Sequence, residues 1–247
     1  MKVPIKSLFV LLALLCVGLT ASAASFAQDA NAVVAPPPTK EVPEGFVSLF
    51  DGKTLEGWDG SEKFWSVEDG CITGRSSEDN PVSYSTFLIW KGEPVKDFTL
   101  LVDFCISSQG NSGIEYRAWK DDAREHGLNG YQADISPGDI MGILYGEALG
   151  EIIAWRGEAA KFDVDGNKTI EKFADAAEIG KSINMHGWNT YRIEARGNKF
   201  ASYVNDVKTT ELVDERGYSP KEGVFGLQMH PGPPMIVQYK NIFLKTR

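Results

Sequence analysis

The residues best suited to chemistry lie near the C-terminus, where Gln228 and His230 precede a turn rich in glycine and proline. In a β-strand, side chains two positions apart point to the same face. We therefore expect Gln228 and His230 to share one face of a sheet, with Leu227 and Met229 on the other. Such a pair is typical either of a ligand-binding wall or of a solvated sheet face, and these residues alone do not decide between the two.

Polar side chains at alternating positions occur in three further segments. These are Glu115 and Arg117 in residues 113–119, Gln132 and Asp134 in residues 131–135, and Tyr145 and Glu147 after Gly142. Together with the C-terminal pair they offer carboxylates, amides, a guanidinium, an imidazole and aromatic rings. That set suits a hydroxyl-rich ligand, because the polar groups exchange hydrogen bonds with hydroxyls while aromatic faces cover the apolar side of a sugar ring.

Several of these residues also have a purely structural interpretation. Arg117 can pair with a carboxylate as part of the scaffold, Asp134 can cap the turn at residues 136–138, and Glu147 can be solvated. Of the three histidines in the chain, His230 is the best candidate for catalysis because its strand ends at an abrupt turn. The sequence contains no Gly-x-Ser-x-Gly, P-loop or GxGxxG motif, and no Glu-x-Asp-x-Glu strand of the kind that retaining glucanases carry.

The elements that must position these side chains are short strands separated by Gly, Asp, Asn and Pro. We predict strands at residues 46–50, 64–67, 71–75, 86–90, 98–106, 113–119, 131–135, 151–157, 190–196 and 199–205, and two more at the C-terminus. Gly197-Asn198 is predicted to be a hairpin turn, and only residues 175–181 look helical. Many strands at regular spacing predict one all-β domain over residues 45–247, a two-sheet jelly-roll sandwich of the concanavalin A type.

One loop has part of the residue spacing of a calcium-binding EF-hand. Asp163, Asp165 and Asn167 are spaced as in an EF-hand, but Lys168 stands where the sharp-turn glycine belongs and Ala174 where the bidentate glutamate belongs. We therefore interpret residues 163–167 as the tip of a hairpin.

The N-terminus is interpreted as a targeting segment. Residues 1–27 have a basic start, an apolar run and a small-residue cleavage site, which predicts a signal peptide and a periplasmic or secreted protein; a lipoprotein anchored at Cys16 is the alternative. Residues 28–44, with Pro36-Pro37-Pro38, predict an extended linker. No membrane span is expected, because the apolar run is too short.

Charge and cysteine content narrow the partners only a little. The formal net charge of -9, which becomes more negative when a leader with two lysines is removed, disfavours nucleic acid and anionic membranes and favours small neutral or cationic ligands. Cys71 and Cys105 fit equally well as an exported disulfide or as buried thiols, and no spacing indicates a zinc site.

Six segments, in this order, resemble one family. They are residues 46–60 (FVSLFDGKTLEGWDG), 64–75 (FWSVEDGCITGR), 98–118, 130–135 (GYQADI), 187–207 and 223–245. Together they resemble a family first described as a domain of unknown function and now called the 3-keto-disaccharide hydrolase or 3-keto-glycoside lyase/hydratase family. The resemblance covers about residues 45–246, and it implies a fold similar to concanavalin-type lectins and glucanases.

The resemblance implies that the enzyme breaks a glycosidic bond by elimination. A partner sugar 3-dehydrogenase makes a 3-keto sugar, a base removes the acidified C2 proton, the aglycone leaves C1, and water adds back. On this basis His230, Asp134 and Glu147 are the candidates for the base and acid roles. Substrate contacts are assigned to Glu115, Arg117, Gln132, Tyr145 and Gln228, with Arg117, Tyr145 or a metal at the enolate oxygen.

Some questions stay open at this level. Many members of the family carry Glu-x-Gln where this chain has Gln132-x-Asp134, so the sugar that it accepts is in doubt. Asp134, Glu147 and His230 have donor atoms suited to a divalent cation, although no tight spacing demands one. The alternatives to an enzyme are a non-catalytic carbohydrate-binding module that uses the same sheet face, and a protein-interaction domain with a flat apolar patch.

Overall fold

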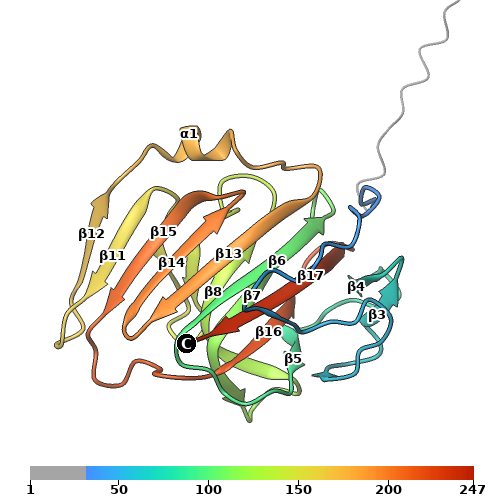
Figure 1. Ribbon diagram of the computed structural model, residues 1–247, viewed down its shortest axis with the longest axis horizontal. Coiled ribbons are helices and arrows are strands. Elements are labelled where there is room, and N and C mark those ends of the chain that lie inside the picture. The colour runs from blue at the N-terminus through green and yellow to red at the C-terminus, as the bar shows by residue number, and fades with distance from the viewer. Residues whose placement is uncertain (1–31) are drawn as a thin grey trace, which may run out of the picture.

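The computed structural model describes residues 32–247, and within them the strands form two sheets that pack face to face (Figure 1). Sheet A is mixed and contains, in spatial order, β12 (Lys168–Lys172), β11 (Glu158–Phe162), β15 (Val207–Asp214), β14 (Lys199–Val204), β13 (Asn189–Arg196), β6 (Phe98–Ile106), β17 (Ile236–Thr246), β4 (Cys71–Arg75) and β3 (Trp65–Glu68), with β1 (Val47–Ser48) paired to β17. Sheet B is antiparallel and contains, in spatial order, β10 (Glu151–Ala154), β9 (Leu144–Gly146), β8 (Gly127–Ile135), β7 (Ser112–Asp121), β16 (Val224–Met229), β5 (Thr86–Trp90) and β2 (Trp58–Asp59). The predicted two-sheet sandwich is confirmed, whereas the predicted signal peptide lies outside the described residues.

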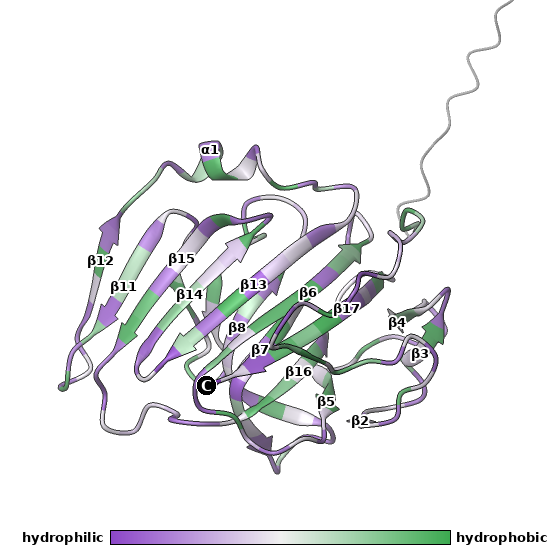
Figure 2. Ribbon diagram, viewed as in Figure 1, coloured by the Kyte–Doolittle hydropathy of each residue, from purple (hydrophilic) through white to green (hydrophobic). Residues whose placement is uncertain are grey.

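The core lies between the sheets because alternate residues of each strand are apolar. Along β13 buried and partly exposed positions alternate without interruption, and hydrophobic and hydrophilic colours alternate along the strands in Figure 2. Phe98 of sheet A meets Phe225 of sheet B edge to face, with ring centroids 4.9 Å apart, a favoured geometry for aromatic pairs. The inner faces are therefore committed to packing, and any site on sheet B must use its outer face.

The turns predicted from local sequence are confirmed. Arg196 pairs with Lys199 across the Gly197-Asn198 turn. The loop at residues 163–167 joins β11 to β12, and the Asp163 carboxylate accepts hydrogen bonds from the backbone N–H groups of Asp165 and Asn167. This is the self-capping behaviour of aspartate in turns. The short helix is also present as α1 (Ala176–Gly180), with the Asp175 side chain as its N-cap.

Five strands of the two sheets, β2, β9, β11, β12 and β15, were not predicted as strands. Strand β9 has three residues and β2 has two, while every residue of β12 is exposed, so β12 has no apolar face to reveal it. Strand β11 pairs parallel to β15, a non-local contact. Long-range pairing, and not propensity, therefore defines this edge of sheet A.

The described part of the predicted linker lies against the outer face of sheet A. The Lys40 ammonium is 2.8 Å from the buried Asp103 carboxylate, and the Lys40 backbone N–H donates to the Asn241 side chain at 3.0 Å. The Lys240 ammonium of β17 also donates a hydrogen bond to the Pro37 carbonyl at 2.9 Å. These contacts attach the segment to β6 and β17 instead of leaving it free of the domain.

The two cysteines of the domain do not form a disulfide. Within residues 32–247, Cys71 and Cys105 are buried free thiols, and burial raises the pKa of Cys71 to about 11. No helix in that range is long and apolar enough to cross a membrane.

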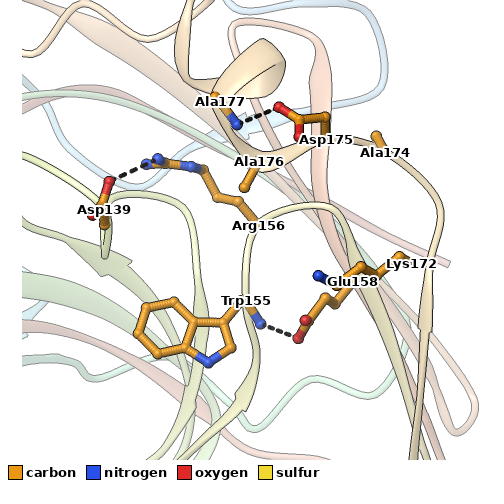
Figure 3. A pocket seen from close by; sticks show the side chains of 9 residues that line it. All are labelled: Asp139, Trp155, Arg156, Glu158, Lys172, Ala174, Asp175, Ala176 and Ala177. Carbon is orange, nitrogen blue, oxygen red and sulfur yellow. Dashed lines mark hydrogen bonds and ion pairs between the residues drawn. The ribbon is translucent and has the colours of Figure 1, made fainter.

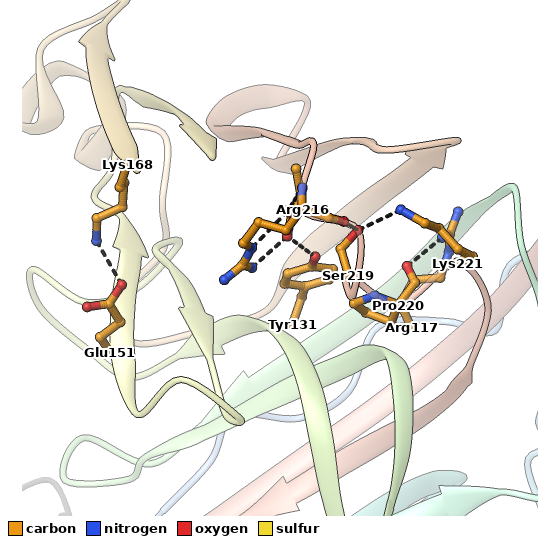
Figure 4. A network of polar contacts seen from close by, with 9 residues as sticks. Arg117, Tyr131, Glu151, Lys168, Arg216, Ser219, Pro220 and Lys221 are labelled. Carbon is orange, nitrogen blue, oxygen red and sulfur yellow. Dashed lines mark hydrogen bonds and ion pairs between the residues drawn. The ribbon is translucent and has the colours of Figure 1, made fainter. Parts of the chain in front are cut away.

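A buried ion pair ties the end of sheet A to sheet B. The Arg216 guanidinium donates to both oxygens of Asp214 at 2.9 and 2.6 Å, and the Tyr131 hydroxyl of β8 donates to Asp214 at 2.5 Å; Figure 4 shows Tyr131 beside Arg216. The Asp214 and Arg216 side chains are 0% and 5% exposed. Burial alone would raise the pKa of Asp214, but the hydrogen bonds from Arg216 and Tyr131 outweigh it and lower the pKa.

Asp214→Ala should therefore destabilise the fold severely. The substitution leaves the Arg216 guanidinium buried without its counter-ion, which costs about 3–5 kcal/mol when one member of a buried pair is removed. Urea unfolding at neutral pH measures the loss. The matched control is Glu222→Ala, because Glu222 forms an exposed pair with Lys96 at 3.7 Å and should cost less than about 1 kcal/mol. Equal losses in the two variants would contradict the stabilising role of the network.

Candidate active site

A cavity of about 250 Å³ opens on the outer face of sheet B. It is lined by Ser85, Asn111, Gln132, Asp134, Ile140, Ile143, Tyr145, Glu147, Ile152, Gln228 and His230. We call it the central cavity. It contains six of the eight predicted site residues, which come from β8, β9 and β16 or the turns that follow them. The two that it does not contain are Glu115 and Arg117.

Strand register explains why these residues meet. Gln132 of β8 pairs with Tyr145 of β9, while Asp134 pairs with Gly113 of β7. Each of these side chains alternates with residues of the core, so all point away from it. Gly113 is required here, because a Cβ at that position would lie 2.3 Å from the Gln132 side chain. The missing side chain leaves the space that Gln132 occupies in the floor of the cavity.

Asp134 is a carboxyl group adapted to proton transfer near neutral pH. Its Oδ2 accepts a hydrogen bond from the Gln132 amide at 3.2 Å, while Oδ1 is buried and has no hydrogen-bond partner within residues 32–247. Burial raises the pKa of Asp134 to about 7, with a further contribution from the negative charge of Glu147. A carboxyl with such a pKa exists in both protonation states at neutral pH, as a general acid or base requires.

His230 presents one ring nitrogen as a proton acceptor. Its Nδ1 lies 2.6 Å from the Pro231 carbonyl oxygen. A carbonyl oxygen only accepts, so Nδ1 must carry the hydrogen, and Nε2 of the neutral ring is left as the basic atom. The turn that begins at Pro231 therefore fixes both the tautomer and the orientation of the ring.

Glu147 is held by an arginine that the sequence did not indicate. Arg124, in the loop between β7 and β8, donates to the Glu147 carboxylate at 3.1 Å, to Asp121 at 2.6 Å and to the Leu128 carbonyl at 3.1 Å. Three bonds in different directions fix the guanidinium plane, which suits arginine and not lysine. Glu147 is thus an oriented carboxylate that can accept hydrogen bonds from hydroxyls.

The remaining polar groups of the central cavity provide both donors and acceptors. Burial, followed by the charges of Glu147 and Asp134, raises the pKa of Tyr145, so its phenol keeps its proton at neutral pH. Side-chain oxygens of Asn111, Gln132 and Gln228 are buried and find no partner in the described part of the chain. Buried polar atoms normally have partners, and unpaired oxygens facing a cavity are suited to bind ligand hydroxyls.

Glu115 shares the predicted face but does not line the central cavity. It pairs with Gln132 across β7 and β8, yet its side chain is fully buried and neither oxygen has a hydrogen-bond partner among the residues that the structure describes. Burial, with the nearby charge of Glu147, raises its pKa well above the usual value. The assignment of Glu115 as a direct substrate contact is therefore corrected, since its side chain lies beneath the surface.

Arg117 is not in the site, and the prediction that it shares a face with Glu115 is wrong. Its φ of 49° and the register shift between Tyr116 and Trp119 mark a bulge in β7 that rotates the side chain. The guanidinium instead donates to Pro220 O at 3.0 Å, Gly197 O at 3.2 Å and Asp97 at 3.3 Å. A bulge breaks the two-residue alternation on which the prediction rested.

The three candidate acid–base residues do not form a metal site. Within residues 32–247 no group of three or more His, Cys, Asp or Glu side chains is arranged to hold a metal ion. Asp134, Glu147 and His230 therefore line one cavity without converging as ligands. The divalent cation stays a prediction.

Sequence reasoning also missed Ser85, Asn111 and three isoleucines of the cavity wall. Asn111 lies in a Gly-Asn-Ser-Gly turn that could have indicated an exposed polar group. Ile140, Ile143 and Ile152 gave no signal, because isolated apolar residues are common and do not by themselves indicate a site.

With this geometry in place, comparison with known proteins identifies the family. The model of the 3-keto-alpha-glucoside-1,2-lyase-like domain matches residues 45–245. The chain belongs to this family. A curated relative, the 3-keto-disaccharide hydrolase of Bacteroides thetaiotaomicron, is 35% identical over 85 residues, which cover 30% of this chain and 28% of that protein. The chain thus matches less than a third of the length of this relative.

Solved structures share the sandwich fold of this lyase-like domain. A Parabacteroides distasonis protein proposed to be a glycosyl hydrolase has a TM-score of 0.55 at 20% identity, covering 82% of this chain and 99% of its own. The carbohydrate-binding module CBM66 of Bacillus subtilis has a TM-score of 0.51 at 19% identity, covering 77% and 96%. At these identities the likeness concerns the sandwich fold.

Ionisation of Asp134 should destabilise the protein as the pH rises. The folded state binds the proton more tightly, with a pKa of about 7 against an ordinary value of 3.8, so stability is lost between these two values, where the carboxyl is ionised in the unfolded chain but still protonated in the folded one. Relative to that of Asp134→Asn, the free energy of unfolding of the wild type should fall by about 2–3 kcal/mol between pH 5 and pH 8. Urea unfolding at both values measures this. Asp206→Asn, at a side chain 94% exposed, is the control. If the free energy of unfolding changed equally with pH in the wild type and in Asp134→Asn, this would contradict the burial effect.

Proposed function

We propose that this protein cleaves 3-keto-glycosides by removing the proton next to the ketone, eliminating the leaving group and adding water. The observation that carries the proposal is the presence in one cavity of an imidazole with an accepting Nε2 and a carboxyl, Asp134, whose pKa is raised to about 7. Membership of the 3-keto-alpha-glucoside-1,2-lyase-like family supports the substrate class. The acidic, hydroxyl-binding cavity is consistent with a neutral sugar.

The first step would be proton transfer from C2 of the sugar to His230 Nε2. A ketone at C3 makes this proton acidic, because the electron pair left on C2 delocalises into the carbonyl and forms an enolate. A neutral imidazole whose Nδ1 is already bonded to Pro231 can accept the proton on its other nitrogen without changing its orientation.

The enolate oxygen would be stabilised by hydrogen-bond donors of the central cavity. The Tyr145 phenol is the best of these, because its raised pKa keeps it protonated and able to donate. Preorganised donors at the atom where negative charge develops are an effective source of rate acceleration. The Glu147 carboxylate, oriented by Arg124, would accept hydrogen bonds from sugar hydroxyls and so fix the ring.

Loss of the leaving group would complete the elimination. The electron pair of the enolate forms a double bond between C1 and C2, the C1–O bond breaks, and protonated Asp134 gives its proton to the departing oxygen. Water then adds its hydroxyl to C1 and a proton to C2, so the sum of the steps is hydrolysis. The same two groups act in reverse during hydration, as the second step of an acid–base cycle requires.

The proposal requires an upstream oxidation and fits an exported protein. The substrate ketone would be supplied by a separate sugar 3-dehydrogenase, since the chemistry starts from an oxidised sugar. The predicted leader at residues 1–27 supports a location in the periplasm or outside the cell.

Removing either acid–base group should abolish turnover. The full mature chain, given a 3-keto-glucoside with a chromogenic leaving group, should release the chromophore, whereas the unoxidised glucoside should not react. Asp134→Asn and His230→Gln should each lower kcat by about 100-fold or more, the usual share of one acid–base group. His186→Gln and Asp206→Asn, at exposed positions, are the controls. Parallel reactions with EDTA test the predicted cation.

Two results would overturn this assignment. Wild-type rates in both Asp134→Asn and His230→Gln would place the chemistry elsewhere. No release from the keto substrate, together with calorimetric binding of sugars, would favour a non-catalytic carbohydrate-binding module, which the likeness in fold to such a module makes the alternative function.

The pH dependence of kcat should report the state of Asp134. The carboxyl acts as an acid only when protonated, so kcat should fall as the pH rises through about 7, the value to which burial raises its pKa. The residual activity of Asp134→Asn should lack this alkaline decline. A decline that persists unchanged in the variant would assign it to another group.

A further inference from the structure

Two more cavities lie near the central cavity, one beside β5 of sheet B and one beyond β10, where β11 and β12 of sheet A form part of the wall. One, of about 400 Å³, lies beside β5 and includes Asn80, Ser83, Tyr84, Glu125 and His126 in its wall. The other, of about 650 Å³, lies beyond β10 and includes Asp139, Trp155, Glu158 and Lys172. We call them the β5-side and β10-side cavities. None of their residues takes part in the chemistry proposed above.

The β5-side cavity adjoins the central cavity through one short segment. Ser85 lines the central cavity, while its neighbours Tyr84 and Thr86 line the β5-side cavity. The Tyr84 side chain is 43% exposed, which leaves part of its ring open to a ligand. His126 adds a buried Nδ1 that has no hydrogen-bond partner within residues 32–247, an atom that a ligand hydroxyl could satisfy.

The β10-side cavity adjoins the central cavity through two segments. Asp139 lies next to Ile140 in the chain, and Trp155 follows the strand that contributes Ile152; both isoleucines line the central cavity. Figure 3 shows the Trp155 indole directed from the end of β10 toward the segment that carries Asp139. Trp155 is 44% exposed, unlike a tryptophan of the core.

The segment that carries Asp139 is rigidly supported. Arg156 is almost fully buried and donates to the Gly138 and Met141 carbonyls at 2.8 and 2.9 Å, with Asp139 3.7 Å away. The wall between the central and β10-side cavities is therefore preformed. A preformed wall with an open indole and nearby carboxylates is the usual composition of a sugar-binding surface, in which the ring stacks on the aromatic face and its hydroxyls meet polar groups.

The three cavities follow the order of the strands. From β5 to β10 sheet B contains five strand-to-strand steps, and at about 4.8 Å each these span about 24 Å. We propose that this surface binds a glycan longer than a disaccharide, with its reacting sugar in the central cavity and further sugars on Tyr84 at one end and Trp155 at the other. The proposal rests on the function proposed above and extends it from a small keto-glycoside to an oligosaccharide.

Chain length is the variable that tests this. The full mature enzyme is given a short chromogenic 3-keto-glucoside and a series of gluco-oligosaccharides of two to six units that carry one 3-keto sugar. The kcat/KM value should rise with length. Trp155→Ala and Tyr84→Ala should each lower kcat/KM for the longest substrates by about 5- to 10-fold, the scale of one aromatic contact, and leave the short substrate unaffected.

Trp119→Ala is the matched control. Trp119 is 46% exposed, close to the value for Trp155, but it lines a different cavity with Leu149 and Tyr218. It should behave as wild type with every substrate. All three positions are exposed, so the variants should fold, and thermal unfolding checks this.

The outcomes separate this proposal from the proposed function. Turnover of keto substrates that is independent of length and unaffected by Trp155→Ala and Tyr84→Ala would overturn the extended site and leave the function intact. An equal loss in Trp119→Ala would also overturn it. No turnover of any keto substrate would overturn the proposed function. Calorimetry with the unoxidised oligosaccharides would then test the extended site on its own. An affinity that rises with length and is lost in both variants would support that site, and an affinity independent of length would overturn it.

Discussion

The structure depends on the burial of acidic side chains on the outer face of one sheet. Sheet B packs its inner face on the core, so alternation places Glu115, Gln132 and Asp134 on the other face, where loops cover them. Charges that lose water must gain partners or take up protons. Here partners are few, and protons are taken up instead. Burial therefore makes Asp134 and Glu115 hold their protons more tightly than they would in bulk water.

The same arrangement divides the carboxyls into different roles. Glu147 has an arginine partner that orients its carboxylate, whereas burial raises the pKa of Glu115 well above its usual value and that of Asp134 to about 7. Environments that push the pKa values of neighbouring acids apart are how one site obtains both an acid and an acceptor. Arg124 contributes by fixing where the negative charge resides, and that charge helps to raise the pKa of Asp134.

Local patterns predicted most of the fold and part of the site. Alternation placed Gln228 with His230 and Gln132 with Asp134 correctly, because β16 and β8 are regular where these residues lie. It failed at Arg117, where a bulge in β7 resets the faces. It could not find Arg124, since the contact with Glu147 joins two loops. Short-range physics thus gives the strands, whereas bulges and loop contacts decide which side chains meet.

The unpaired atoms of the central cavity show how stability and binding are connected. Buried oxygens without partners at Asn111, Gln132 and Gln228 cost stability in the free protein, whereas the buried Asp214–Arg216 pair has its hydrogen bonds. A ligand with several hydroxyls would satisfy those oxygens, whereas an apolar ligand would leave them unpaired. The polar groups that the fold leaves without partners would therefore favour a hydroxyl-rich ligand, before any residue of the flanking cavities is considered.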